Sequence, residues 1–352
     1  MEENLKKIIN IAILAPSGDN SQPWKFVIKK NAIWVYNAPE KDTSLYNFNM
    51  YASMVAIGAL LENIKITATH FNYSVEIKIN ENLFQDHVAT CIFNGNETKE
   101  DELFKYIKKR VTNRKVYKNN KLNKELINKL LDLNCEYSKN LGIKVITEDN
   151  LIKKLANASS VNEQIVLENK KLHSFLFGHI TWTEEEDSKK KGFYIKTLEL
   201  KRPQRLVFKI LSSWKINNFL NKLGISKFIA KDNARLYSKS GAMLAITTNI
   251  LNRDAFLKTG MLMQKIWLIA TQHNIYLQPL TGIIFLNHRI NNNNNKEEFS
   301  DRHINLIKKS YKKMEEIIIE NGRFITTMFR LGYADKPSTY TKRQEAYIEL
   351  ER

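Results

Sequence analysis

Cysteine, proline and glycine are scarce in this sequence, which holds 2, 6 and 12 of them among 352 residues. Two cysteines, Cys91 and Cys135, are too few for a disulfide scaffold or a cysteine-rich zinc or iron–sulfur centre, and they indicate a reducing compartment. No run of 18 apolar residues occurs, so we expect no membrane-spanning helix. The chain starts Met-Glu-Glu-Asn, which is acidic where a signal peptide needs basic residues. We therefore expect a cytoplasmic protein.

Signatures of metal and dinucleotide binding are also missing. The 7 histidines never stand at metal-ligand spacing: His173 and His179 are six residues apart, and neither has an acidic partner four residues later. We therefore expect no metal site. No Gly-x-Gly-x-x-Gly motif occurs, so the sequence predicts no Rossmann-type site.

Negative charge is in short supply. The 55 Lys and Arg against 37 Asp and Glu give a formal net charge of +18, and such a surplus can attract nucleic acid by releasing counterions from phosphates. The lysines are scattered, however, which favours a solvated lysine surface. We therefore expect no nucleic-acid partner, and a basic nucleic-acid-binding protein stays open as a remote alternative.

Apolar residues are plentiful, at 43% of the chain, and the length suits about two domains. Apolar periodicity predicts helices at 4–14, 51–72, 99–109, 122–133, 253–274 and 300–320. It predicts strands at 26–28, 33–36, 75–79, 88–93, 242–248, 283–286 and 324–331. The stretch 150–240 is mostly helical in pattern, and Asn291–Asn295 predicts a loop. This mixture is typical of an α+β fold.

Two segments have alternative interpretations. Arg205–Trp214 is basic and amphipathic, so it can touch a membrane surface, but we favour a packed helix whose lysines reach out to water. We therefore expect no membrane partner. The tail beyond Lys336 is polar and charged, and it is predicted to be either loose or an arm across another subunit.

The two long predicted helices repeat one pattern. Residues 58–72 and 260–274 align without a gap and share six of fifteen residues, among them Gly58 with Gly260. Small residues at matched positions allow a second helix to approach closely. We interpret the repeat as a duplication that gives two related halves packed together. Two unrelated amphipathic helices remain the alternative.

A polar turn follows the first predicted helix. Pro16 ends that helix, and Ser17 to Asn20 form a tight turn whose hydroxyl and amide can face a planar heterocycle. Trp24 can anchor the turn to the strand behind it. The segment resembles the Pro-Ser-x-x-Asn-x-Gln-Pro-Trp signature of the nitroreductase family of FMN-dependent oxidoreductases. The matching residues are Pro16, Ser17, Asn20, Gln22, Pro23 and Trp24. In that family the turn lies on the flavin ring, so the resemblance implies cofactor binding by Ser17, Asn20 and Gln22.

A second segment, Arg110-Val-Thr-Asn-Arg114, carries two guanidinium groups four residues apart with a hydroxyl between them. Such a group suits a dianion. The segment resembles the arginine-rich motif with which the family holds the FMN phosphate. The resemblance implies cofactor contacts from Arg110, Thr112, Asn113 and Arg114.

Two later segments extend the resemblance. Gln278-Pro-Leu-Thr-Gly282 resembles the family's Pro-x-x-Gly loop beside flavin N5, which implies contacts from Pro279, Thr281 and Gly282. There a glycine permits close approach, and the backbone N–H groups of Thr281 and Gly282 would stabilise reduced flavin. Phe329-Arg-Leu-Gly-Tyr333 resembles the terminal strand, whose arginine, here Arg330, completes the phosphate pocket.

The order of these segments departs from that of ordinary family members, because the turn precedes the arginine-rich motif and no arginine occurs before Arg110. Ser159–Gln164 repeats the turn only faintly. The arrangement resembles single-chain members that place two nitroreductase-like halves in one polypeptide as a pseudo-dimer. We expect a first half at 1–105 and a second at 106–352, with a helical insertion at about 175–240 that covers the pocket. One FMN per chain is expected, in a monomeric pseudo-dimer or a homodimer.

The resemblance also implies the chemistry. FMN would accept a hydride from NADH or NADPH and pass electrons to a small planar acceptor such as a nitroaromatic, quinone or enone. No side chain stands out in the sequence as a catalytic acid. Two alternatives within the resemblance are a protein that sequesters FMN and a flavin-dependent dehydrogenase of a biosynthetic intermediate.

Overall fold

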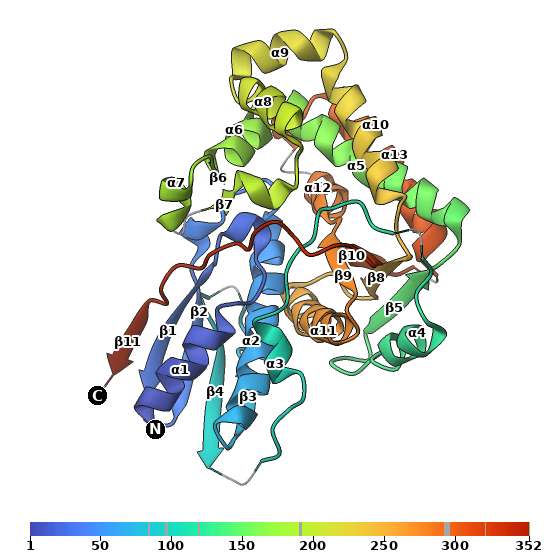
Figure 1. Cartoon of the computed structure of the whole chain (residues 1–352). Coiled ribbons are helices and arrows are strands. Elements are labelled where there is room, and N and C mark those ends of the chain that lie inside the picture. The colour runs from blue at the N-terminus through green and yellow to red at the C-terminus, as the bar shows by residue number, and fades with distance from the viewer. Residues whose placement is uncertain are drawn as a thin grey trace.

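Two helices of twenty residues each, α2 (Tyr51–His70) and α11 (Arg253–Gln272), form the centre of the molecule. The computed structural model describes residues 1–83, 85–95, 98–118, 120–189, 192–291, 296–320 and 322–351. One sheet lies beside α2 and another beside α11 (Figure 1). Both helices are buried along most of their length, as their nearly continuous apolar sequences require.

Each sheet is built mainly from antiparallel strands. The first has the order β11-β1-β2-β4-β3 and consists of β1 (Trp24–Lys29), β2 (Ala32–Asn37), β3 (Tyr73–Ile79), β4 (His87–Gly95) and β11 (Ile348–Glu351). The second has the order β5-β8-β10-β9 and consists of β5 (Leu141–Ile146), β8 (Ala242–Thr248), β9 (Tyr276–Pro279) and β10 (Phe324–Gly332). In both sheets the fourth strand in chain order lies between the second and the third, and the long helix joins the second to the third. The chain is therefore an α+β protein of two related halves, as the repeated helix sequence predicts.

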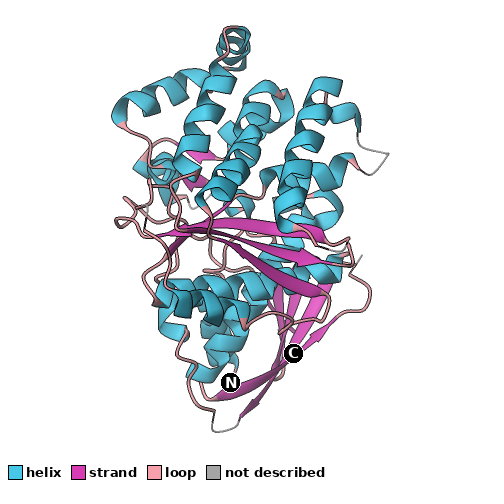
Figure 2. Ribbon diagram, turned by 90° about the vertical axis from the view of Figure 1, so that its right-hand side faces the viewer, coloured by secondary structure: helices cyan, strands magenta, loops and turns pink. Residues whose placement is uncertain are grey.

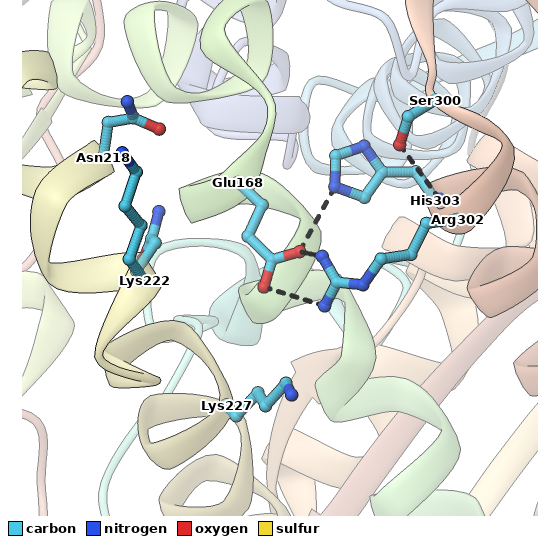
Figure 3. A pocket seen from close by; sticks show the side chains of 8 residues that line it. Glu168, Asn218, Lys222, Lys227, Ser300, Arg302 and His303 are labelled. Carbon is cyan, nitrogen blue, oxygen red and sulfur yellow. Dashed lines mark hydrogen bonds and ion pairs between the residues drawn. The ribbon is translucent and has the colours of Figure 1, made fainter.

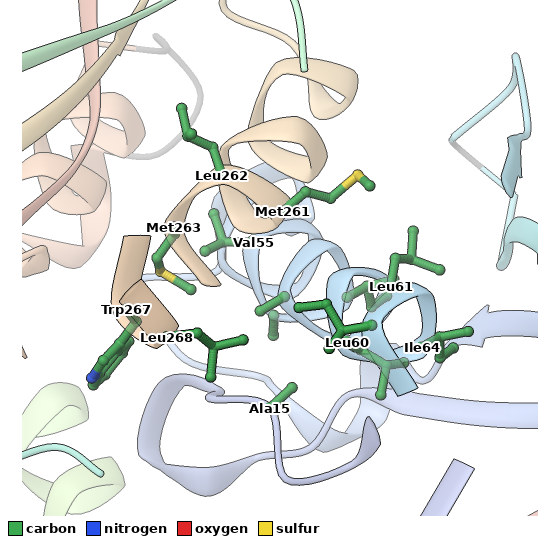
Figure 4. Close-up of a cluster of buried hydrophobic side chains, with 14 of the residues drawn as sticks. Ala15, Val55, Leu60, Leu61, Ile64, Met261, Leu262, Met263, Trp267 and Leu268 are labelled. Carbon is green, nitrogen blue, oxygen red and sulfur yellow. The ribbon is translucent and has the colours of Figure 1, made fainter. Parts of the chain in front are cut away.

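The two long helices cross at the matched glycines. A Cβ on Gly58 would overlap the carbonyl oxygen of Leu257, and a Cβ on Gly260 would overlap that of Val55. Val55 and Leu257 each stand three residues before their own glycine, so the contact is reciprocal, as at a two-fold axis. Figure 4 shows apolar side chains of both helices around this crossing, in one shared core.

A series of helices connects β5 to β8 along the chain, whereas the equivalent strands β1 and β2 are joined by two residues only. They are α5 (Asp149–Glu168), α6 (Lys170–Gly178), α7 (Glu184–Ser188), α8 (Arg202–Leu211), α9 (Trp214–Lys222) and α10 (Ile225–Tyr237), with the short strands β6 (Ile180–Thr181) and β7 (Phe193–Tyr194). Figure 2 shows these helices gathered beyond the four-stranded sheet. This helical insertion starts at Asp149, earlier than the residue 175 expected from the sequence.

Among the remaining helices, two differ from the elements that the sequence predicts. The full set is α1 (Glu2–Ala12), α3 (Phe104–Ile107), α4 (Lys124–Leu131), α12 (Gly282–Ile290) and α13 (Asp301–Ile318), with 3-10 turns at Gly18–Asn20, Pro39–Lys41, Phe48–Met50, Ile195–Leu198 and Lys296–Glu298. The predicted strand at 283–286 is wrong, because that apolar run is a helix buried on most sides, and periodicity alone does not separate the two. The predicted helix at 99–109 shortens to α3. Residues 292–295 of the predicted loop lie outside the described residues.

The C-terminal tail crosses the molecule. It leaves β10, runs over the first half and ends as β11, which pairs in parallel with β1 (Figure 1). The tail is thus an arm across the other half of its own chain, an arrangement that the sequence-based alternatives did not include.

Helices α8 and α9 differ from the packed helix expected there. Leu206, Phe219 and Leu223 are all exposed, and Leu211 and Asn217 are the residues of these two helices that are buried. The reason is that the two helices project from the body of the molecule (Figure 1). In the described part of the chain, no helix combines the length and the hydropathy needed to cross a membrane.

Candidate functional site

Three of the predicted segments meet at one edge of the four-stranded sheet. Thr112 forms a parallel bridge with Leu277, and the backbone N–H of Asn113 donates to the Leu277 carbonyl at 3.2 Å. On the neighbouring strand, Arg330 Nε donates to Gln278 Oε1 at 2.7 Å. Three parts of the chain that are far apart in the sequence are therefore neighbours: residues 112–114, the segment 278–282 and Arg330.

Arg330 and Arg114 bring two positive charges together at this edge. Arg330 is fully buried, lies 3.9 Å from the centroid of the Tyr117 ring and donates to the Lys115 carbonyl at 2.8 Å. Arg114 donates to the Thr197 carbonyl at 3.2 Å. Burial lowers the pKa of both arginines, and the charge of Arg114 lowers that of Arg330 further.

No carboxylate of the described residues lies within ion-pair distance of either guanidinium. Asp19 is the carboxylate whose charge acts most on Arg114, and it raises the Arg114 pKa against the effect of burial. Buried charges are normally paired. Two neighbouring guanidinium groups without a direct counter-charge therefore form a candidate anion site.

Arg110 lies at a different place. It donates to the Leu14 carbonyl at 2.7 Å and its guanidinium stands 4.7 Å from the centroid of the Trp267 ring. Arg343, from the C-terminal arm, donates to the Ile13 carbonyl nearby at 3.2 Å. These carbonyls follow α1, where a helix end favours positive charge. Burial, together with the Arg343 charge, lowers the pKa of Arg110 to about 9. None of the described interactions of Arg110 reaches Arg114 or Arg330.

Polar groups of the predicted turn form hydrogen bonds within the turn and to two other segments of the chain. Ser17 Oγ accepts from the backbone N–H of Gln22 at 3.0 Å. Asn20 Nδ2 donates to the carbonyl of Gly192, in the helical insertion, at 2.7 Å. Gln22 Oε1 accepts from the N–H of Gln344, in the C-terminal arm, at 3.0 Å. The turn therefore joins the first half, the insertion and the arm.

The same turn is strained, and two of its buried polar atoms, Asn20 Oδ1 and Ser21 Oγ, have no partner among the described residues. Asp19, Asn20 and Gln22 have φ angles of 46°, 59° and 52°, in the left-handed region that non-glycine residues rarely adopt. Such strain is typical of functional sites. Asn20 is buried, and its Oδ1 finds no donor among the described residues. Buried acceptors without a donor are rare, so this oxygen is a candidate ligand contact.

Gly282 makes the close approach that its sequence context predicts, but with an unexpected neighbour. A Cβ on Gly282 would overlap the side chain of Asn162, which comes from α5. Asn162 Oδ1 accepts from the Tyr46 hydroxyl at 2.9 Å. Thr281 precedes α12 without capping it, so the N-terminal N–H groups of that helix face this region without a side-chain acceptor from Thr281.

Carboxyl groups with raised pKa values accompany the turn. Burial raises the pKa of Asp19, that of Asp42 to about 6 and that of Glu163 to about 7. The Tyr237 hydroxyl donates to Glu163 Oε1 at 2.7 Å, and Glu163 Oε2 has no partner among the described residues. Several shifted groups in one region are typical of an active site.

Four residues near the candidate site were not predicted from the sequence. Tyr46, Asn162, Glu163 and Tyr237 carry no motif of their own. The one available signal was the faint repeat of the turn at Ser159–Gln164, which contains Asn162. That segment is helical, within α5, so the repeat does not form a second turn.

A separate cavity of about 420 Å³ lies in the helical insertion, at α9 and the starts of α10 and α13 (Figure 3). Its lining consists of Glu168, Asn218, Asn221, Lys222, Lys227, Ser300, Arg302 and His303. None of the residues that the sequence predicts for a cofactor is among them.

Comparisons with known proteins give a distant likeness. No family model matches the chain. The uncharacterised protein MT1398 of Mycobacterium tuberculosis is 24% identical over 278 residues, which are 78% of this chain and 38% of that protein. The chain thus spans about two fifths of the length of this curated relative.

Among solved structures, a candidate nitroreductase from Anabaena variabilis has a TM-score of 0.48 and 10% identity, over 95% of this chain and 88% of that one. Some of the other solved neighbours are nitroreductases with bound FMN, among them one from Desulfitobacterium hafniense. A Bacteroides fragilis nitroreductase with bound FMN has a TM-score of 0.39 and 10% identity, over 69% of this chain and 94% of that one. A nitroreductase-like protein from Bacillus cereus has a TM-score of 0.35 and 17% identity, over 70% and 93%. At these scores the function has to be inferred from the chain's own residues.

Proposed function

We propose that the chain binds one FMN between its two halves and acts as a flavin-dependent oxidoreductase. The observation that carries the proposal is the pair of Arg114 and Arg330, two guanidinium groups that lie near each other without a directly paired carboxylate in the described chain. A bound phosphate dianion would supply the missing negative charge through charge-assisted hydrogen bonds. Arg110 would act as a positioning residue, because its hydrogen bond to Leu14 joins the second half to the end of α1.

The residues around the turn also suit a flavin ring. Asn20 Oδ1 is a buried acceptor that needs a donor, which a ring N–H would provide. The uncapped start of α12 at Gly282 offers backbone N–H groups where negative charge develops on a reduced ring. When bound, FMN supplies a hydride acceptor at N5 and a donor of one or two electrons.

Glu163 is the residue of this region best suited to hold a proton. Its pKa is raised to about 7 by burial, so near neutral pH it can both keep and release a proton. The Tyr237 hydroxyl orients it through the hydrogen bond to Oε1, and Oε2 is buried without a partner among the described residues. We propose NADH or NADPH as the electron donor and a small planar nitroaromatic, quinone or enone as the acceptor.

A second candidate function, sequestration of FMN, is favoured by one specific observation. The helical insertion contacts the site at two points, the Gly192 carbonyl on Asn20 and the Thr197 carbonyl on Arg114. A segment held in this way would restrict access to the ring. Anaerobic addition of NADH or NADPH separates the two functions, because an accessible flavin loses its visible bands and a sequestered one keeps them.

The first test compares FMN with riboflavin, which lacks the phosphate. The protein purified without added flavin is expected to show the two visible bands of oxidised flavin. Flavin-free protein is expected to bind FMN at least about a hundredfold more tightly than riboflavin, because two charge-assisted contacts are worth roughly 3 kcal/mol. Fluorescence titration measures both affinities.

Two variants sharpen this test. Arg114→Gln is expected to reduce the preference for FMN over riboflavin about tenfold, because it removes one of the two charge-assisted contacts. Arg323→Gln is the matched control: Arg323 also donates to backbone and side-chain oxygens, but it lies just before the start of β10, at the opposite end from Arg330. It is expected to keep the preference. Equal affinity of the parent protein for both flavins, or no binding of either, would contradict the proposal.

A further inference from the structure

The outer face of α8, α9 and the start of α10 carries a patch of exposed apolar side chains. Seven of the fifteen large hydrophobic residues that are exposed in the described chain lie between residues 206 and 228, with exposed fractions of 44% to 73%. They are Leu206, Val207, Ile210, Ile216, Phe219, Leu223 and Phe228. Patches of this kind mark interaction sites. We call these seven side chains the apolar crest.

The exposed apolar side chains of α9 all lie on one face of the helix. Ile216, Phe219 and Leu223 recur at the spacing of one helix face, and that face points to solvent. The opposite face packs on the body of the molecule. It carries the half-buried Trp214, whose ring centroid lies 5.1 Å from that of His173, and Asn217 and Asn221, whose side-chain amides both donate to the Leu167 carbonyl at 2.7 and 2.6 Å. In an ordinary surface helix the apolar face packs on the body and the polar face meets water. Here three large apolar side chains face solvent instead, so this face needs another environment.

The charges around the crest indicate which environment fits. Residues 200–231 contain eight Lys and Arg and no Asp or Glu. A second copy of the chain, docked face to face, would place two such basic surfaces against each other, which is unfavourable. A nucleic acid would leave the apolar side chains without a partner. An anionic lipid surface matches both features, because its headgroups attract the lysines and its acyl region accepts the apolar side chains.

The cavity in the helical insertion adds a headgroup contact at the edge of the crest. Lys222 stands beside Leu223, and Lys227 beside Phe228; both lysines line the cavity (Figure 3). The one carboxylate in its lining, Glu168, is already neutralised by Arg302 at 2.6 Å and also bonds His303 at 3.2 Å. Neither Lys222 nor Lys227 has an ion-pair partner among the described residues. The cavity therefore suits the phosphate of a lipid headgroup.

We propose that the apolar crest and its basic border dock the protein on the surface of a membrane that contains anionic lipid. Helices of ten and nine residues, α8 and α9, are about half as long as a spanning helix, so they would lie in the interface. Docking in this way is independent of the proposed flavin function, since no residue of the crest contacts the candidate flavin site.

Vesicle co-sedimentation tests the apolar part. The parent protein is expected to bind phosphatidylcholine vesicles that contain phosphatidylglycerol at least about tenfold more tightly than vesicles of phosphatidylcholine alone. Ile216→Ser/Phe219→Ser/Leu223→Ser is expected to lose at least tenfold in binding to the anionic vesicles. Leu131→Ser/Ile250→Ser changes exposed apolar residues elsewhere and is expected to bind as the parent does.

A charge-matched pair tests whether the crest or the net charge is responsible. Lys209→Gln/Lys215→Gln/Lys222→Gln removes three charges at the crest, and Lys308→Gln/Lys309→Gln/Lys312→Gln removes three from α13. We expect a loss of at least tenfold for the first variant and little change for the second. Equal losses would overturn the proposal in favour of non-specific attraction, as would failure of the parent to bind. Free inorganic phosphate is added as a competitor for the cavity lysines. If it abolishes vesicle binding while the triple serine variant binds as the parent does, the crest has no role and the proposal is overturned.

Two further measurements keep the outcomes separate. Flavin content and the urea midpoint of each variant show whether it is folded, so a lipid defect with unchanged flavin content concerns docking alone. Sedimentation velocity shows whether the parent is a dimer that the triple serine substitution dissociates. Such a dimer would identify the crest as a contact between copies and overturn the membrane proposal.

Discussion

The two halves of the chain have the same framework and different chemistry. Gln278 and Glu76 each stand four residues after the asparagine that ends the long helix, so they are equivalent positions on β9 and β3. Opposite Gln278 on the neighbouring strand is Arg330, and opposite Glu76 is Ile92. Where the second half has a buried arginine, the first half thus has an isoleucine. The framework is repeated, but the candidate anion site occurs at only one of the two equivalent sheet edges.

The difference shows which features packing demands and which a ligand demands. Gly58 and Gly260 both remain glycine because each is approached by the other helix's backbone, whatever the site does. Arg330 has no such packing reason to be repeated, and the proposed single flavin would need only one phosphate site. The same holds for the turn at Ser17–Gln22 of the first half, whose Asp19 charge acts on Arg114 of the second. The halves are therefore alike where they contact each other and unlike at the candidate site.

The largest expected effect tests the equivalence at the helix crossing. Gly58→Ala and Gly260→Ala each place a methyl group on a carbonyl oxygen of the opposite helix. Because the backbone has to move, each is expected to lower the free energy of unfolding by about 3 kcal/mol. Urea denaturation measures both losses. Gly178→Ala, where the new methyl meets open space, is the control and is expected to be neutral or slightly stabilising.

Unequal losses would break the comparison. If Gly58→Ala is costly and Gly260→Ala is not, the crossing is not a two-fold contact and the helix repeat is accidental. Similar losses, with the control unaffected, support a duplicated framework.

Much of this framework could be predicted from the sequence, because its signals are local. The hairpin of β1 and β2, the strands β8 and β10 and both long helices follow from apolar periodicity and turn residues. The missed elements depend on tertiary contacts. Strand β11 forms only because the arm reaches β1, and α12 is a short apolar run whose helical state is decided by the glycine start and by burial.

The candidate site was predictable in its segments but not in its grouping. The motif resemblance selected the turn, residues 112–114, the loop at Gly282 and Arg330. It did not separate Arg110 from Arg114, because four residues of loop can turn either way, and here Arg110 is held by the end of α1. Glu163 and Asn162 had only the faint repeat of the turn at Ser159–Gln164 to indicate them, because they come from the helical insertion, which has no counterpart in the first half.

The second prediction concerns this insertion, where the halves differ most. Burial raises the pKa of Glu163 from about 4.5 to about 7, so the folded state holds a proton that the unfolded state releases. Stability from this group is present below pH 4.5 and is lost as the pH rises through about 7. Glu163→Gln cannot ionise and is expected to be more stable than the parent by roughly 3 kcal/mol at pH 8 and nearly equal to it at pH 4.5.

Urea denaturation at pH 4.5 and pH 8 measures the free energy of unfolding of the parent and of the variant. Glu148→Gln, an exposed carboxylate just before the same helix, controls for the loss of one negative charge. A variant that is less stable than the parent at pH 8 would show that Glu163 is ionised and paired in the folded protein. In that case the proton-holding role would pass to Asp42 or Asp19.

The smallest expected effect tests the equivalence at the helix ends. Asn72 and Asn274 follow α2 and α11 with φ angles of 57° and 58°, so both halves end the long helix with the same left-handed residue. Asn72→Ala and Asn274→Ala are each expected to cost about 1 kcal/mol, because alanine is strained in this region, whereas Asn72→Gly and Asn274→Gly should cost nothing or stabilise slightly. Thermal unfolding of the four variants measures the differences. A cost at one end only would mean that the two helices reach their third strands by different turns, and the match of Arg330 with Ile92, which is counted from these asparagines, would lose its basis.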